Sequence, residues 1–502
     1  MIRIETERNI DRLRQVALLQ QAELTRLHAR LVILTQELAH ARGTNAVAAL
    51  QLELTLLHEQ LTARTQALFG RSSEQRPRPP APDQPPPPRP GHGPRAQATL
   101  PLVEVVHVLD GPDQQCPQCG DALRPWAAHY ETADEIDVVE RTFRVVRHQR
   151  QKYTCRCGAC IETALGPRKL RAGGRYSVDF ALAVAVAKYA DHAPLARQVR
   201  QMARAGLVVD TQTLWDQLLA LAGHLTPTYD ALWDAVRAAP VVRFDETRWP
   251  LLDSPTATKW HAWAAASDAG IAYRILGARS TDAAAVVLGD FAGIAVTDGY
   301  EVYQTLRTRR VHDATGPPAF TLAHCWAHAR RKFVTAAPAY PIAAEMLELI
   351  GWLYDIERVA QDAPAAERAA CRADYRTTWS RAVIAHLDAW LTATVALPRS
   401  QLGLAIRYVR DLWAGLTHFL DDARIPLDTN LVERGMRALA LGRKNHYGSR
   451  SERGTQVAAL FYTLIESAKL TGVEPERYLR AAAIRAIDAP GTVTLPRDLL
   501  AS

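Results

Sequence analysis

The chain has 502 residues, 48% of them hydrophobic, and carries a formal net charge of +7 with a pI of about 9.1. This length and composition exclude a wholly disordered protein and predict several domains with hydrophobic cores. The positive charge favours a polyanionic partner, with nucleic acid the first candidate. No apolar run approaches the roughly 18 residues of a membrane span, and the charged N-terminus lacks a signal-peptide core. We therefore expect a cytoplasmic protein with no membrane partner.

Residues 1–70 carry a leucine-rich heptad pattern. Apolar residues recur every seven positions at Ile10, Ala17, Leu24, Leu31 and Leu38. This a/d seam predicts a coiled coil and hence a homo-oligomer; two helices folded back on each other within one chain are the alternative. Residues 71–100 follow as a linker, because ten prolines between 76 and 94 cannot build a packed core.

Cysteines mark the next module, residues 101–165. Of the seven in the chain, five lie between positions 116 and 160. Cys116 and Cys119 have the spacing of a zinc knuckle, and Cys157 and Cys160 repeat it after segments with strand-like alternation, although Cys155 is a possible substitute for Cys157. Four thiolates suit a tetrahedral structural Zn²⁺, and so small a module would have little core without it. The pattern predicts a zinc ribbon-like module.

Residues 166–236 have helical character and the order of a helix-turn-helix. A helix ends near Gly206, and a second begins after a cap at Asp210 or Thr211. In this interpretation Gln212 and Thr213 face DNA bases. Arg197 and Arg200 would contact phosphates, although arginines on a helix are also typical of a solvated face.

An α/β catalytic domain is predicted from residue 237 onward, with its first part at 237–340. We expect strands around 241–249, 258–267 and 271–278, a helix at 281–289, and a strand at 293–297. This order fits an RNase H-like fold. Asp245 and Asp298 follow apolar strand segments, so the two acids suggest a metal site where strands end. An acid in this position is also a common turn or cap residue.

The remaining residues divide into three segments. Residues 341–425 are rich in Ala, Leu, Glu and Arg with helical spacing and predict a helical insertion. Residues 426–475 resume the catalytic domain, with Glu433 on a helix as the third candidate acid, or as half of an i, i+4 pair with Arg437. A basic loop follows, in which Arg443 and Lys444 suit phosphate contacts. Residues 476–502 form the C-terminal tail.

The segment HCWAHARRKF, residues 324–333, ends a further strand. His324 and His328 stand at i, i+4, a spacing that suits a shared metal only if both lie on one helix. We assign the two histidines an accessory role near DNA, with core packing as the alternative. Arg330 and Arg331 are candidate DNA contacts.

The chain resembles the transposases of the insertion sequence 66 family. The motifs DET (245–247), TDGYEVY (297–303), HCWAHARRKF, NLVERGMR (430–437), LGRKN (441–445) and GS (448–449) occur in this order. The leucine-rich N-terminus, the LFGRSSE element and the CPQCG module extend the resemblance over essentially the whole chain. Two departures are the CRCGAC spacing, which blurs the zinc ligands, and Asp428-Thr429-Asn430, where the family tends to carry paired asparagines.

The resemblance implies a DDE recombinase with Asp245, Asp298 and Glu433 as its acids. Carboxylates are hard oxygen ligands, and three of them suit two Mg²⁺ ions about 3.5 to 4 Å apart. The expected activity is cleavage of DNA at the element ends and strand transfer to a target, with accessory proteins of the element as possible partners. A DNA-binding protein with an inactive or assembly-only nuclease domain is the alternative, and a structure-selective nuclease is a minor third.

Overall fold

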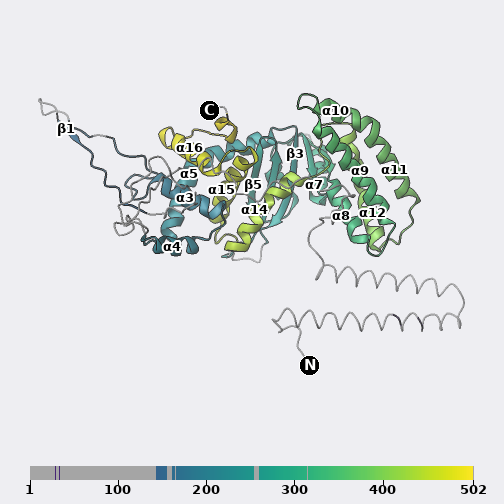
Figure 1. Ribbon diagram of the computed structural model, residues 1–502, viewed down its shortest axis with the longest axis horizontal. Coiled ribbons are helices and arrows are strands. Elements are labelled where there is room, and N and C mark those ends of the chain that lie inside the picture. The colour runs from purple at the N-terminus through teal and green to yellow at the C-terminus, as the bar shows by residue number, and fades with distance from the viewer. Residues whose placement is uncertain are drawn as a thin grey trace, which may run out of the picture. The chain divides into compact units, whose positions relative to one another are not determined.

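A computed structural model describes residues 143–154, 161–163, 165–253, 259–313 and 315–500, together with Ala29 and Ile33 (Figure 1). The predicted coiled coil, linker and most of the zinc module lie outside the described residues, as do the five clustered cysteines. No helix in the described part is long and apolar enough to cross a membrane.

A five-stranded mixed sheet lies at the centre of the described chain, in the order β5-β4-β3-β6-β7. β3 runs antiparallel to β4 and parallel to β6, and β7 is parallel to β6. A two-residue turn at Asp268 and Ala269 joins β4 to β5, and residues 249–260, of which 254–258 are not described, join β3 to β4. Helices α6 and α7 provide the crossovers that parallel strands require. The strands are β3 (Val241–Arg248), β4 (His261–Ser267), β5 (Gly270–Leu276), β6 (Ile294–Thr297) and β7 (Thr321–His324), and the crossover helices are α6 (Thr281–Leu288) and α7 (Glu301–His312).

Both faces of the sheet are covered, which explains the apolar character of its strands. Val242 and Phe244 of β3 belong to a core that includes residues of α6 and α7. Side chains on a strand alternate between faces, so Glu246 shares the face of Phe244 and Asp245 lies on the other. That second face packs against α14 (Asn430–His446) and α15 (Glu452–Leu470).

Three helices precede the sheet: α3 (Val178–Tyr189), α4 (Leu195–Arg204) and α5 (Thr211–Arg237). Gly206, with φ +81°, makes the turn after α4, and the Asp210 side chain caps α5 by accepting the Thr213 N–H at 2.6 Å. α5 continues well beyond residue 223, to the edge of the sheet. Residues of α3 and α5 share one core with β4, β5 and α15, so these helices are packed against the sheet.

A helical bundle separates α8 (Trp326–Ala336) from α14 and buries its own core, which also takes in residues of β6 and β7. Within it Arg376 is almost fully buried and donates to Glu357 and to the carbonyls of Phe419 and Asp422. The bundle helices are α9 (Ala343–Asp362), α10 (Arg368–Tyr375), α11 (Arg381–Ala393), α12 (Gln401–Asp411) and α13 (Trp413–Thr417), with a π-helical turn at Arg376–Ser380 and a 3-10 turn at His418–Leu420.

The last described residues pack on the core. α16 (Pro475–Asp488) buries Tyr478, whose hydroxyl donates to the carbonyl of Thr494, and a 3-10 turn spans Pro496–Leu499. Near the start of the described chain, β1 (Lys152–Thr154) and β2 (Ile161–Thr163) pair antiparallel. These two strands lie on either side of the CRCGAC segment, which is itself outside the described residues, so the zinc ribbon stays a prediction.

Candidate active site

Asp245 lies on β3 opposite Ala264 of β4, on the sheet face that packs against α14. Its Oδ1 accepts the N–H of Glu246 at 2.8 Å. Burial raises the pKa of this carboxyl to about 7, and the charges of Glu246, Asp298 and Glu433 act in the same direction. The ionised form of Asp245 is therefore disfavoured by its surroundings unless a cation joins it.

Asp298 follows β6 directly, where the chain turns into α7. Its Oδ1 accepts the N–H of Tyr300 at 2.9 Å, and Gly299 takes a φ of +87° that favours glycine. The Tyr408 hydroxyl of α12 donates to the backbone carbonyl of Asp298. The helical bundle thus fixes the position of an acid that belongs to the sheet.

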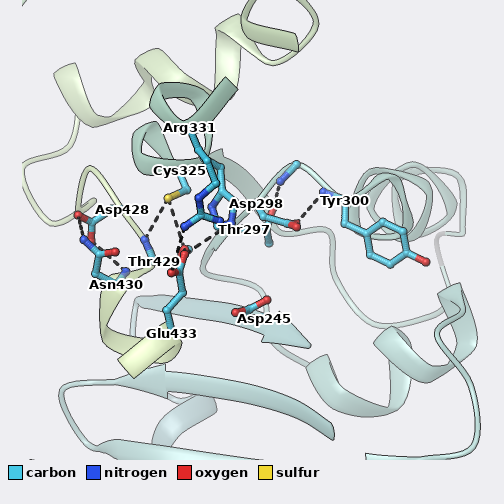
Figure 2. Close-up of polar contacts among 12 residues, drawn as sticks. Asp245, Thr297, Asp298, Tyr300, Cys325, Arg331, Asp428, Thr429, Asn430 and Glu433 are labelled. Atoms are coloured by element: carbon cyan, nitrogen blue, oxygen red, sulfur yellow. Dashed lines mark hydrogen bonds and ion pairs between the residues drawn. The ribbon is translucent and has the colours of Figure 1, made fainter. Parts of the chain in front are cut away.

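Glu433 lies in the first turn of α14 and faces α8 (Figure 2). Its Oε1 is 3.5 Å from Nε2 of His328, and its Oε2 is 3.7 Å from a guanidinium nitrogen of Arg331. The Thr429 hydroxyl donates to Oε1 at 3.4 Å. No ion pair joins Glu433 to Arg437 among the described residues, so the alternative of a local i, i+4 pair is not realised there.

The three acids come from three elements and act on one another. Figure 2 shows the carboxyl of Asp245 to the right of Glu433 and below Asp298. Both neighbours contribute to the raised pKa of Asp245. One carboxyl oxygen of Asp245 and one of Asp298 each accept a hydrogen bond from a nearby backbone N–H. Asp side chains commonly make such local bonds to the backbone. The charges of Asp298 and Glu433 disfavour ionised Asp245. Carboxylate oxygens are hard ligands, so a divalent cation such as Mg²⁺ would suit these acids and offset their repulsion.

Glu246 lies on the opposite face, and its side chain is only 2% exposed. Arg279 donates to Oε1 at 2.5 Å, and the Tyr303 hydroxyl donates to Oε2 at 3.0 Å. This network supports the strand that carries Asp245. Sequence reasoning did not find Arg279, Tyr303 or the Tyr408 contact, because each partner lies far away in the chain and follows no local pattern.

The two histidines of HCWAHARRKF are separated by the junction between β7 and α8. His324 is buried against Gly415 and Thr297, and burial lowers its pKa to about 4. His328 instead faces Glu433. The structure therefore supports core packing for His324 and a position in the candidate site for His328. Arg331 is half-exposed beside Glu433, and Arg330 is partly buried.

Among the candidate DNA contacts, Arg331 lies beside Glu433. Arg443 donates to the Thr247 hydroxyl at 3.3 Å and to the carbonyl of Arg248, so it ties α14 to β3. Lys444 is exposed. In the helix-turn-helix-like region Arg197, Arg200 and Gln212 are exposed and Thr213 is partly buried.

Two family models match the sequence. Residues 173–457, more than half of the chain, match the model described as "Transposase IS66 family". The chain belongs to the IS66 family of transposases. Residues 113–158 match the zinc-finger binding domain of transposase IS66. This IS66-family chain therefore has a zinc-binding domain, and the match includes Cys116, Cys119, Cys155 and Cys157 but ends before Cys160.

Three proteins of Sinorhizobium fredii are similar to this IS66-family chain along most of their length. The uncharacterized protein y4jD is 32% identical over 80% of both chains. The uncharacterized protein y4hP is 27% identical over 97% of this chain and 87% of its own. The uncharacterized protein y4qI is 33% identical over 70% of this chain and 67% of its own.

Proposed function

We propose that this transposase is a DDE enzyme that binds the ends of its insertion sequence, cleaves DNA there with the help of divalent metal, and transfers the strand to a target. The observation that carries the proposal is that the charges of Asp298, after β6, and Glu433, on α14, act on buried Asp245 of β3 and help to raise its pKa to about 7. A buried carboxyl with a perturbed pKa beside other acids is typical of a catalytic site.

The strand order supports an RNase H-like catalytic domain. An antiparallel meander of β3, β4 and β5 continues into parallel β6 and β7, with the acids on β3 and directly after β6. In this interpretation the helical bundle between α8 and α14 is an insertion, and Tyr408 is its contribution to the site.

Asp245, Asp298 and Glu433 would hold Mg²⁺ through carboxylate oxygens, and Asp245 would lose its proton as the cation enters. Two bound Mg²⁺ ions supply Lewis acidity that activates a water for cleavage and stabilises the leaving 3′ oxygen. Tyr300 and Tyr408 keep Asp298 in place. His328 and Arg331 orient Glu433 toward its neighbours.

DNA affinity would come from parts of the chain that are distinct from the acids. We assign it to the zinc module, to the exposed Arg197, Arg200 and Gln212 with Thr213, and to Lys444 and Arg443 near the end of α14. A structural Zn²⁺ would hold the module through Cys116, Cys119, Cys160 and either Cys157 or Cys155. Self-association through residues 1–70 would bring two element ends together, with or without accessory proteins.

The experiment compares Asp298→Asn with the parent on one labelled fragment of the element end. Asparagine keeps the shape of the side chain but removes a negative charge, so nicking in Mg²⁺ should fall by orders of magnitude. DNA affinity in a gel shift without Mg²⁺ should be unchanged. Asp245→Asn and Glu433→Gln should behave alike.

Glu246→Gln is the matched control, because it neutralises an acid of the same strand that points to the other face. It should nick at close to the parent rate. Parent-like nicking by Asp298→Asn would refute the assignment of the three acids. Specific binding without nicking by any protein, the parent included, would favour a DNA-binding protein with an inactive nuclease domain.

A further inference from the structure

A second set of metal-ligand side chains lies behind Glu433. One donor atom each from Cys325, His328 and Glu433 lies within 4.8 Å of the other two. They come from the residue that precedes α8, the first turn of α8 and the first turn of α14. Thiolate, imidazole and carboxylate together form a mixed donor set that suits Zn²⁺ or Co²⁺, whereas Mg²⁺ prefers oxygen ligands alone.

The backbone around Cys325 is fixed on both sides. Its N–H donates to the Thr297 carbonyl at 3.0 Å, and the next N–H, of Trp326, donates to the carbonyl of Leu427 at 2.8 Å. The thiol is 1% exposed. It accepts the Thr429 N–H at 3.3 Å and the Thr429 hydroxyl at 3.4 Å. The same hydroxyl reaches Oε1 of Glu433 at 3.4 Å, so Thr429 bridges two of the three donors.

The His328 ring is available to a cation. Its Nδ1 is buried and has no hydrogen-bond partner in the part of the chain that the structure describes. Its Nε2 is 3.5 Å from Glu433. In a tetrahedral zinc site the ligand atoms lie roughly 3.4–3.6 Å apart, as expected for bonds of 2.0 to 2.3 Å. The donor atoms of Cys325, His328 and Glu433 lie within 4.8 Å of one another, and rotation of the His328 and Glu433 side chains would bring them to the spacing of a zinc site.

We propose that Cys325, His328 and Glu433 form a binding site for a zinc-class divalent ion, with the fourth position open to water, and that occupation of this site withdraws Glu433 from Asp245 and Asp298. Binding would release the thiol proton to solvent. The ion would also displace Arg331 from Glu433. The second half of the proposal rests on the proposed function: zinc bound here would inhibit Mg²⁺-dependent cleavage.

The test uses the full chain, purified with its zinc module loaded, and titrates it with Co²⁺. The parent should develop a thiolate-to-cobalt charge-transfer band and visible ligand-field bands, and Cys325→Ser should lack the charge-transfer band. Cys371→Ser is the matched control, because Cys371 lies on α10 outside the cluster, and it should behave as the parent. His328→Asn should bind Co²⁺ at least tenfold more weakly, which provides a second variant if Cys325→Ser does not fold.

Identical cobalt spectra for the parent, Cys325→Ser and His328→Asn would overturn the site. In a second arm, Zn²⁺ is added to the nicking reaction. Zn²⁺ should inhibit the parent and Cys371→Ser at concentrations that leave Cys325→Ser active. Equal inhibition of all three proteins would refute the proposal that the zinc-class site withdraws Glu433 from Asp245 and Asp298. If the parent does not nick at all, the proposed function fails while the cobalt result still decides the metal site.

Discussion

Asp245 and Glu246 are neighbours in sequence, but the pleat of β3 gives them different surroundings. Glu246 has two partners, Arg279 and Tyr303. Asp245 has a backbone amide and the charges of other acids. The difference follows from strand alternation alone, since each residue inherits the face that its position dictates. Glu246, with its two side-chain partners, supports the strand. Asp245 has no such cationic partner among the described residues, so its carboxylate is available to a metal cation.

The raised pKa of Asp245 predicts a pH-dependent stability. In the unfolded chain an Asp titrates near 3.9, whereas here the value is about 7, so the fold favours the protonated acid. Protonated Asp245 contributes its full stabilisation of the folded state below about pH 4. This stabilisation is lost as the pH rises through about 7. Asp245→Asn should therefore raise Tm relative to the parent, by an amount that grows from pH 5 to pH 7 and then levels off.

The measurement is thermal unfolding in Mg²⁺-free buffer at pH 5, 6, 7 and 8. The gain at pH 8 should be on the order of a few kcal/mol, since one pKa unit corresponds to about 1.4 kcal/mol. Asp282→Asn is the control, because its side chain is 85% exposed and pairs on the surface with Arg309. A Tm difference for Asp245→Asn that does not vary with pH would contradict the prediction.

At the scale of elements, α14 carries Glu433 at its start and ends in a strained cap. Tyr447 closes the helix with a φ of 62°, a left-handed conformation that glycine adopts more easily, and its side chain is 70% exposed. The loop after it is tied to the β3–β4 connection, because Trp249 donates to Ser449 and the Ser449 N–H donates to the Pro250 carbonyl. These contacts of Ser449 therefore hold Tyr447 in its left-handed conformation despite the strain.

Tyr447→Gly should stabilise the protein by about 0.5–1 kcal/mol, because it relieves the left-handed strain and removes few contacts. The adjacent Gly448→Ala should do the reverse, since its φ is +102° and a Cβ there would collide with the Pro250 carbonyl. Urea unfolding of both variants measures the two effects. A destabilised Tyr447→Gly would mean that the tyrosine side chain makes contacts that outweigh the strain.

At the scale of the whole molecule, the sheet is held between two cores on one face and a third on the other. One core joins α3 and α5 to β4, β5 and α15, and another joins the helical bundle to β6 and β7. Leu427, just before α14, belongs to the bundle core, whereas Val432 and Met436 of α14 belong to the core with α15, so the position of Glu433 depends on both cores. Substitutions in either core should therefore affect the site as well as stability.

Self-association is a prediction at the same scale. Deleting residues 1–70 should convert an oligomer of the full chain into a monomer, because an exposed heptad seam buries itself by pairing. Light scattering of the full chain and the deletion variant at equal concentrations is the measurement. If the deletion variant keeps the parent mass, the seam closes within one chain and another surface mediates assembly.

The sequence by itself determined the local elements and the family. Strand alternation at 241–248, the Asp210 cap of α5 and the helical spacing after residue 341 are short-range properties, and the ordered motifs identified the transposase. Only the tertiary structure decided which distant groups meet. Tyr408 on Asp298, Arg279 on Glu246 and Cys325 behind Glu433 join residues that are 33 to 110 positions apart. Such contacts depend on how helices pack against the sheet, and no local periodicity encodes that packing.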